Sequence, residues 1–172
     1  MPGLSPAITA TIVEVGRIAH FTGRFFRNAF HRRFAWDEFL RQCVVHGYRS
    51  LALVGITAFI MGLVLTVQSR PTLARFGAES MLPAMVAISM VREIVPVITA
   101  LICAGKIGSS MGAELGSMRV TEQIDAMEVS GTNPFKYLVV TRVWSTTLMV
   151  PLLVVLADGI AIWASWVGVN IK

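Results

Sequence analysis

Charged residues are scarce in this sequence. Of its 172 residues, 15% are Asp, Glu, Lys or Arg, whereas 55% are hydrophobic. Soluble globular domains carry about 25% charged residues, and a mean hydropathy of +0.68 is well above their usual range. The composition therefore favours an integral membrane protein and argues against a soluble single domain.

Cysteine and several common motifs are also rare or missing. The two cysteines, Cys43 and Cys103, lie far apart and suggest neither a disulfide framework nor a metal site. No G-x-x-x-x-G-K-[ST] occurs, which excludes an ATP site of the P-loop type. The N-terminus lacks a short apolar core followed by a small-residue cleavage site, so we expect no removable signal peptide.

The first 49 residues form a basic amphipathic region. From about Pro6 to Phe34, apolar and Arg side chains recur at helical spacing, which is typical of a helix lying in the plane of a membrane interface. These residues are Ile8, Ile12, Val15, Ile18, Ala19, Phe25, Phe26 and Phe30, with Arg17, Arg24, Arg27, Arg32 and Arg33. A helix packed on a partner subunit is the alternative. Anionic lipid is favoured over nucleic acid as a partner, because the aromatics occupy helical apolar positions.

Three apolar runs in residues 50–172 predict about three transmembrane helices. The first, roughly Ser50 to Gln68, has no charge in about 19 residues, close to the length that crosses the hydrocarbon. The second extends from Met81 to about Gly112. The third, from about Leu138 to Val169, is long enough to tilt or kink. We expect Pro71 to end the first span.

A polar segment separates the second and third runs. The stretch ELGSMRVTEQIDAMEVSGTNP predicts a cytoplasmic amphipathic helix of about three turns within residues 114–131, ending near Gly131. Its apolar face would hold Val120, Ile124 and Met127, with Glu122, Asp125 and Glu128 pointing elsewhere. The Lys/Arg bias places this segment and the N-terminus in the cytoplasm and residues 69–80 outside. The acidic face suits a protein partner better than the negatively charged inner leaflet.

Two charged residues interrupt the second apolar run. Arg92 and Glu93 are costly inside a span, so we expect them to face a bundle interior or a wet cavity. A structural ion pair with another helix and a role in lining a substrate path are equally supported. Pro96 removes its own N–H and crowds the carbonyl of Arg92, which predicts a kink beside the charges.

Small residues then recur every fourth position, at Ala104, Gly108, Gly112 and Gly116. Such a ridge allows close approach of another helix. Gly108 to Gly112 also fits G-x-S-x-G, the nucleophile elbow that would make Ser110 the nucleophile of a hydrolase. That elbow needs a preceding strand and a downstream His, whereas every His lies upstream, so we interpret the match as accidental. A membrane-embedded serine hydrolase and a non-transporting scaffold remain the alternative functions.

Residues 92–144, beginning Arg-Glu-x-x-Pro and continuing through AGKIGSSMGAELGSMRVTEQ, resemble the MlaE/YrbE permease family. These are membrane subunits of ABC transporters that move lipids with MCE-domain proteins. The resemblance implies that the segment around 114–131 is the coupling helix that docks on a separate ATPase, and that a lipid path begins near the end of the first span. The implied coupling residues are Glu114, Met118, Arg119, Thr121, Glu122, Gln123 and Met127; the implied path residues are Arg92, Glu93, Leu65, Gln68, Leu73 and Phe76.

The resemblance also implies an assembly. The expected partners are a cytoplasmic ABC ATPase, an MCE-domain lipid-binding protein, a second permease copy and membrane lipids, with no nucleic acid. The chain itself would bind no cofactor, since ATP and Mg would sit on the ATPase. The expected location is the bacterial inner membrane, with several spans. Family members continue with further spans after the position of Val169, so we expect the permease domain, residues 50–172, to be incomplete at its C-terminus.

Overall fold

A computed structural model describes residues 6–29 and 35–170, and every element in these ranges is helical. In chain order the elements are α1 (Pro6–Ala29), α2 (Trp36–Arg75), η1 (Glu79–Met81), α3 (Leu82–Ser89), η2 (Met90–Ile94), α4 (Val95–Val120), α5 (Gln123–Val129), η3 (Phe135–Val140) and α6 (Thr141–Asn170). The predicted all-α class is confirmed. Four members of the predicted basic helix, Phe30, Arg32, Arg33 and Phe34, lie outside the described residues.

Three helical segments are long and apolar enough to cross a membrane: Trp36–Arg75, Glu79–Val120 and Phe135–Asn170. This confirms the three predicted spans, but the first helix continues past Pro71 to Arg75. Proline removes one helical hydrogen bond while its fixed φ still fits a helix, so the helix can continue beyond it. The end comes at Gly77, whose φ of +66° allows the Ala78 N–H to donate to the Leu73 carbonyl at 2.9 Å.

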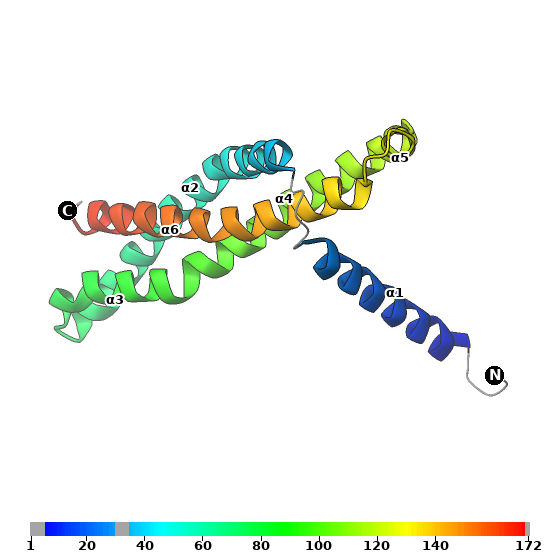
Figure 1. The fold of residues 1–172 in the computed structure, drawn as a ribbon. Helices are drawn as coiled ribbons and strands as arrows, with labels where there is room; N and C mark the ends of the chain where they lie inside the picture. Colours follow the sequence, from blue (N-terminus) through cyan, green and yellow to red (C-terminus); the bar gives the residue numbers. More distant parts are fainter. Residues whose placement is uncertain (1–5, 30–34, 171–172) are drawn as a thin grey trace.

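Helices α2 and α6 form the main packed pair of the fold, and the α3–α4 segment packs against both (Figure 1). Small residues make this contact close. On α2 the buried positions include Val54, Ala58 and Gly62, and on α6 they include Ala157 and Ala161. A Cβ added to Gly62 would lie 2.5 Å from the carbonyl oxygen of Ala161, so only glycine fits there. The missing side chain of Gly62 therefore lets the backbones of α2 and α6 come into direct contact at this point.

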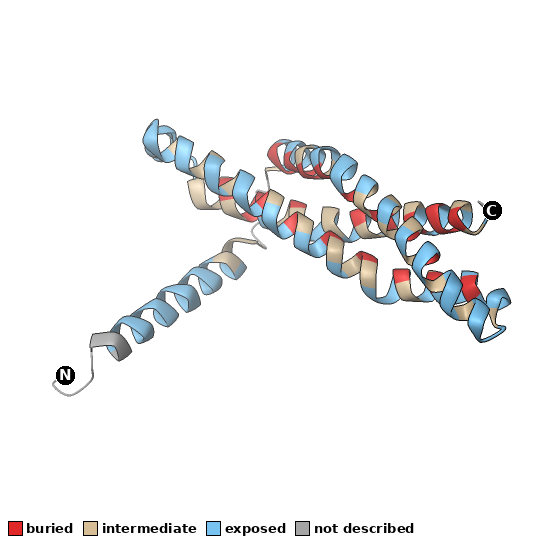
Figure 2. Ribbon diagram, turned by 180° about the vertical axis from the view of Figure 1, so that it is seen from behind, coloured by how far each residue is buried: buried red, intermediate tan, exposed pale blue. Residues whose placement is uncertain are grey.

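Helix α1 extends away from these packed helices and is exposed along most of its length (Figure 2). It meets them at η3, where the rings of Phe21 and Phe135 contact edge to face with centroids 5.2 Å apart. The guanidinium of Arg24 lies 4.5 Å from the centre of the Phe135 ring. The apolar residues of α1, among them Ile12 and Ile18, remain uncovered by the described chain. Both a membrane interface and a partner subunit can supply that cover.

We predict that Gly62→Ala destabilises the protein by about 1–3 kcal/mol, because the new methyl group forces α2 and α6 apart. Gly112→Ala is the matched control: it lies in a helix, and a Cβ there meets nothing within 4 Å. Its effect should stay within about 1 kcal/mol and can be stabilising. Thermal unfolding of both variants in the same detergent tests this; equal loss in the two would refute the tight contact.

Candidate functional site

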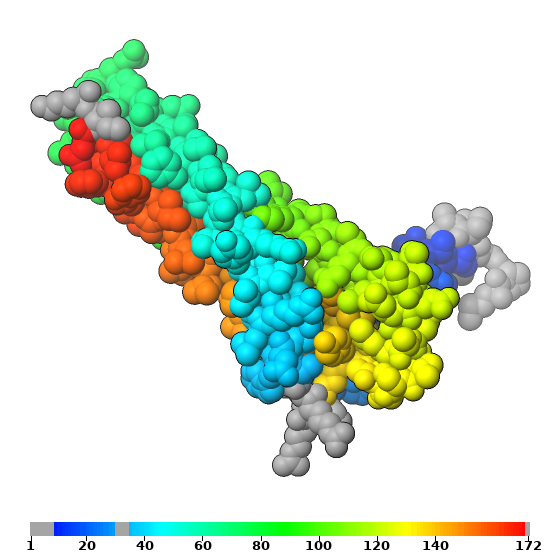
Figure 3. All heavy atoms as spheres, turned by 90° about the horizontal axis from the view of Figure 1, so that it is seen from above, coloured from blue at the N-terminus to red at the C-terminus, as the bar shows by residue number. Residues whose placement is uncertain are grey.

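The buried charged side chains of the described residues, Glu38 and Arg142, lie at one end of the packed helices. In Figure 3 the first turns of α2 lie beside the α4–α5 region at this end, and the C-terminus of α6 lies with α3 at the other. We call this the polar end and define it by Glu38, Gln42, His46, Glu114, Tyr137 and Arg142. These residues come from α2, α4, η3 and α6, so one cluster joins all three apolar segments.

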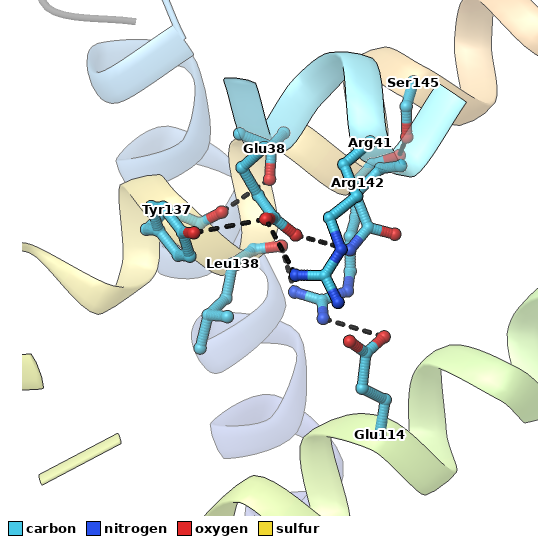
Figure 4. A network of polar contacts seen from close by, with 9 residues as sticks. Glu38, Arg41, Glu114, Tyr137, Leu138, Arg142 and Ser145 are labelled. Carbon is cyan, nitrogen blue, oxygen red and sulfur yellow. Dashed lines mark hydrogen bonds and ion pairs between the residues drawn. The ribbon is translucent and has the colours of Figure 1, made fainter. Parts of the chain in front are cut away.

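Glu38 is one of the two carboxylates of the polar end, and it is buried (Figure 4). Its Oε1 accepts a hydrogen bond of 2.7 Å from the Gln42 amide, one helical turn further along α2. Its Oε2 accepts one of 3.1 Å from the Tyr137 hydroxyl and lies 3.6 Å from the Arg41 guanidinium. The carboxylate is thereby held by both α2 and η3.

Arg142 is the buried cation of the polar end, with its side chain only 3% exposed. Its Nη1 donates to the Leu138 carbonyl at 3.0 Å, and its Nη2 lies 2.9 Å from the Glu114 Oε2 (Figure 4). The Nη2 and Oε2 atoms are close enough for an ion pair but are not aligned as a hydrogen bond. The Nε of Arg142 and the Nε2 of buried His46 have no hydrogen-bond acceptor or donor within the described part of the chain. The pair therefore rests on charge more than on directed hydrogen bonding.

The predicted coupling segment is two helices rather than one. α4 runs on to Val120, and α5 begins at Gln123. Between them Glu122 adopts a left-handed conformation, with φ of +57°, which breaks the helix. An ion pair between Arg119 and Asp125 spans the break. The direction of α5 is therefore set by one unusual backbone residue and one pair of side chains.

The residues assigned to coupling by resemblance fall into two groups in this structure. Glu114 turns to Arg142 and Arg119 to Asp125, so both are occupied within the chain. The Thr121 hydroxyl donates to the Ser117 carbonyl at 2.9 Å. The remaining four lie near the break or on α5: Met118 and Met127 are half-buried, whereas Glu122 and Gln123 are exposed. Their contact with an ATPase stays a prediction.

Arg92 and Glu93 lie in η2, a π-helical turn rather than part of a regular α-helix. Pro96 has no N–H to offer the Arg92 carbonyl, and in the widened turn the Val95 N–H donates to the carbonyl of Met90, five residues back. The kink predicted beside these charges thus corresponds to a π-helical turn. Both charged side chains are exposed on the single chain, and neither forms an ion pair with any described residue. The structure thus does not place them facing the interior formed by α2 and α6, and their role in a substrate path stays a prediction.

The small-residue ridge is also uncovered. A Cβ built on Gly108, Gly112 or Gly116 meets nothing within 4 Å. The close helix contact in this fold is made instead at Gly62, and sequence reasoning missed it because it followed the four-residue repeat of α4. Tight packing of another helix on this ridge stays a prediction.

The remaining path residues lie toward the end of α2 opposite the polar end. Leu65 and Leu73 pack against the apolar core, whereas Gln68 and Phe76 are exposed. A cavity of about 570 Å³ opens beside them; it is lined by Leu63, Val67, Arg70, Pro71, Ala74, Glu79 and Gly168. Leu65, Gln68 and Leu73 lie on α2, as most of the cavity lining does, and Phe76 follows it directly. None of the four residues chosen from the sequence lines the cavity itself.

Ser110 lies inside α4, which is helical from Val95 to Val120. A nucleophile elbow needs a strand, a sharp turn and a helix around its serine. The G-x-S-x-G match has none of this geometry, so it provides no support for the hydrolase alternative.

The fold and the polar end define a class: an α-helical membrane protein with three apolar segments joined by one ion-pair cluster. Residues 39–171 match the family Permease MlaE, and the chain belongs to that family.

The chain is 42% identical over 131 residues to a probable ABC transporter permease protein of Rickettsia felis, covering 76% of this chain and 51% of that protein. It is 37% identical over 134 residues to the intermembrane phospholipid transport system permease protein MlaE of Haemophilus influenzae, covering 77% and 51%. A probable ABC transporter permease protein of Synechocystis is 37% identical over 155 residues, covering 87% and 59%. The chain thus spans about half the length of the curated relatives it matches.

Most of the polar end was not found from the sequence. Of its six residues, only Glu114 was named from the sequence, as a coupling residue implied by the resemblance. A signal was available, since Glu38, Gln42 and His46 recur every four residues on one face of α2. Polar residues at that spacing on an otherwise apolar helix indicate a buried polar contact.

We predict that Tyr137→Phe lowers the stability of the protein by about 1–2 kcal/mol, because the buried Glu38 loses a hydrogen bond. Tyr48→Phe is the matched control, since its side chain is 79% exposed and lies on α2 near the same end. Thermal unfolding in detergent measures both. Equal midpoints for Tyr137→Phe and the unaltered chain would show that this hydrogen bond contributes nothing.

Proposed function

We propose that this chain is the permease subunit of an ABC transporter that moves phospholipids or related lipids, driven by a separate ATPase. The observation that carries the proposal is the coupling segment: in a chain of the MlaE permease family, a short helix with exposed acids follows a backbone break at the polar end. The relative from Haemophilus influenzae is named for phospholipid transport. The relatives from Rickettsia felis and Synechocystis are named as ABC transporter permeases.

The proposed assembly places the polar end in the cytoplasm. The ATPase docks on α5 and on the residues beside the break at Glu122, and it binds and hydrolyses ATP in its own site. This chain binds no nucleotide itself, in keeping with the absence of a P-loop sequence. A second permease copy and an MCE-domain protein complete the complex in the bacterial inner membrane, which the chain crosses several times.

The proposed mechanism links the C-terminal end of the second apolar segment to the π-helical turn within it. ATPase closure displaces α5, and α4 carries that displacement toward the π-helical turn at Met90–Ile94. Arg92 and Glu93 lie on this turn and face outward, where a second copy can enclose them in a lipid path. The free energy must come from the partner, because only a ligand that binds two states differently can drive a switch between them.

We predict that Glu122→Lys abolishes recovery of the ATPase with the tagged permease, because it reverses an exposed charge at the docking surface. Co-purification from the native membrane, with bound proteins and lipids identified by mass spectrometry, is the measurement. ATPase retained at the unaltered level would contradict this docking surface.

Two further variants separate charge from backbone. Glu122→Gly removes the carboxylate but favours the positive φ seen at this position, so it keeps the break. Loss of the ATPase in this variant as well assigns the contact to the carboxylate itself. Asp37→Lys makes the same change of net charge at an exposed acid in the first turn of α2, and it should leave the ATPase bound.

A further inference from the structure

The contact between Arg142 and Glu114 joins two helices that are held very differently. Arg142 belongs to α6, which packs closely along α2, and its guanidinium is fixed by burial and by the Leu138 carbonyl. Glu114 belongs to the last third of α4, and its side chain is 38% exposed. Arg142 is therefore the stationary member of the pair, and Glu114 is the member that can leave.

The surroundings of Glu114 support this difference. The face of α4 opposite Glu114 is not covered by the described chain, since a Cβ added at Gly112 or Gly116 meets nothing within 4 Å. The apolar core reaches along α4 only as far as Ile107 and Met111. Beyond Met111, the ion pair between Glu114 and Arg142 is the polar contact between described residues that joins α4 to α6. This part of α4 continues directly to the break at Glu122 and to α5.

Withdrawal of Glu114 would leave the buried guanidinium of Arg142 without its carboxylate partner. A buried guanidinium without a carboxylate is strongly disfavoured, so Arg142 needs another acceptor when Glu114 withdraws. Its Nε is an unused donor, and Glu38 is the other carboxylate of the polar end (Figure 4). A coupling element needs two discrete arrangements rather than a continuous series of positions. Exchange of the Arg142 contact from Glu114 to Glu38 would give this buried charge two such arrangements.

We propose that Arg142 is the positioning residue that links the coupling segment to the membrane helices: it holds Glu114 in one state of the transport cycle and releases it in the other. This inference rests on the proposed function. It assigns Glu114 to the relay inside the permease rather than to the surface that touches the ATPase. Lipid transfer should then depend on the pair, whereas ATPase docking should not.

The test uses the complete complex of permease, ATPase and carrier protein with phospholipid vesicles. Glu114→Gln removes the charge and keeps the shape of a half-exposed side chain, and Arg142→Gln and the double variant complete a cycle. We expect each variant to retain the ATPase, and lipid transferred per ATP hydrolysed to fall roughly tenfold in Glu114→Gln. The double variant should be no worse than the single ones, because both remove the same contact. Asp37→Asn, at an exposed acid in the first turn of α2 and outside the polar end, should have no effect.

A distance measurement separates a relay from a purely structural ion pair. Spin labels at Ser117 and Thr147, both exposed, report the separation of α4 from α6. The distance should change when nucleotide traps the unaltered complex and should stay constant in Glu114→Gln. Unchanged transfer in Glu114→Gln, additive losses in the cycle, or a distance that never changes would each overturn the relay while the ATPase stays bound. Absence of the ATPase from the unaltered complex would overturn the proposed function and the relay together.

Discussion

The buried guanidinium of Arg142 is the constraint on which the polar end depends. A cation removed from water must be paired and hydrogen-bonded, or its burial costs several kcal/mol. In this fold the pairing partner comes from α4 and the hydrogen-bond acceptor from the preceding turn, at Leu138. One side chain on α6 therefore determines where the end of α4 lies. The same charge acts on His46, which is also buried at the polar end.

The helices divide into a closely packed part and a loosely attached part. Glycine and alanine bring α2 and α6 into backbone contact at Gly62 and Ala161, where any added atom would collide. Such contacts have a single arrangement. At the end of α4 the glycines face open space, and the ion pair between Glu114 and Arg142 joins this end to α6. Because ion pairs can exchange partners and close backbone contacts cannot, movement is easier in α4 than in the α2–α6 pair.

Local patterns predicted much of the fold and little of the polar end. Run length and hydropathy identified three spans, and Pro96 identified the irregular turn at Arg92, because each signal acts within a few residues. The pairing of Glu114 with Arg142 joins positions 28 apart and depends on how α4 and α6 cross, so no local pattern encodes it. The glycine ridge illustrates the opposite case: its spacing indicates that a helix can approach, but not which helix does.

The break at Glu122 was unpredictable for a different reason. A non-glycine residue in the left-handed region costs roughly 1–2 kcal/mol, so propensity favours glycine wherever the chain needs that conformation. The same chain does use glycine at positive φ at Gly77 and Gly131. The glutamate in this conformation is exposed, and an ion pair between Arg119 and Asp125 spans the break. Backbone strain of this kind concentrates at sites where a side chain is needed in one fixed direction. Glu122 is exposed and lies on the segment where we propose that the ATPase docks, so a constraint from that contact can explain why the strained position holds a glutamate.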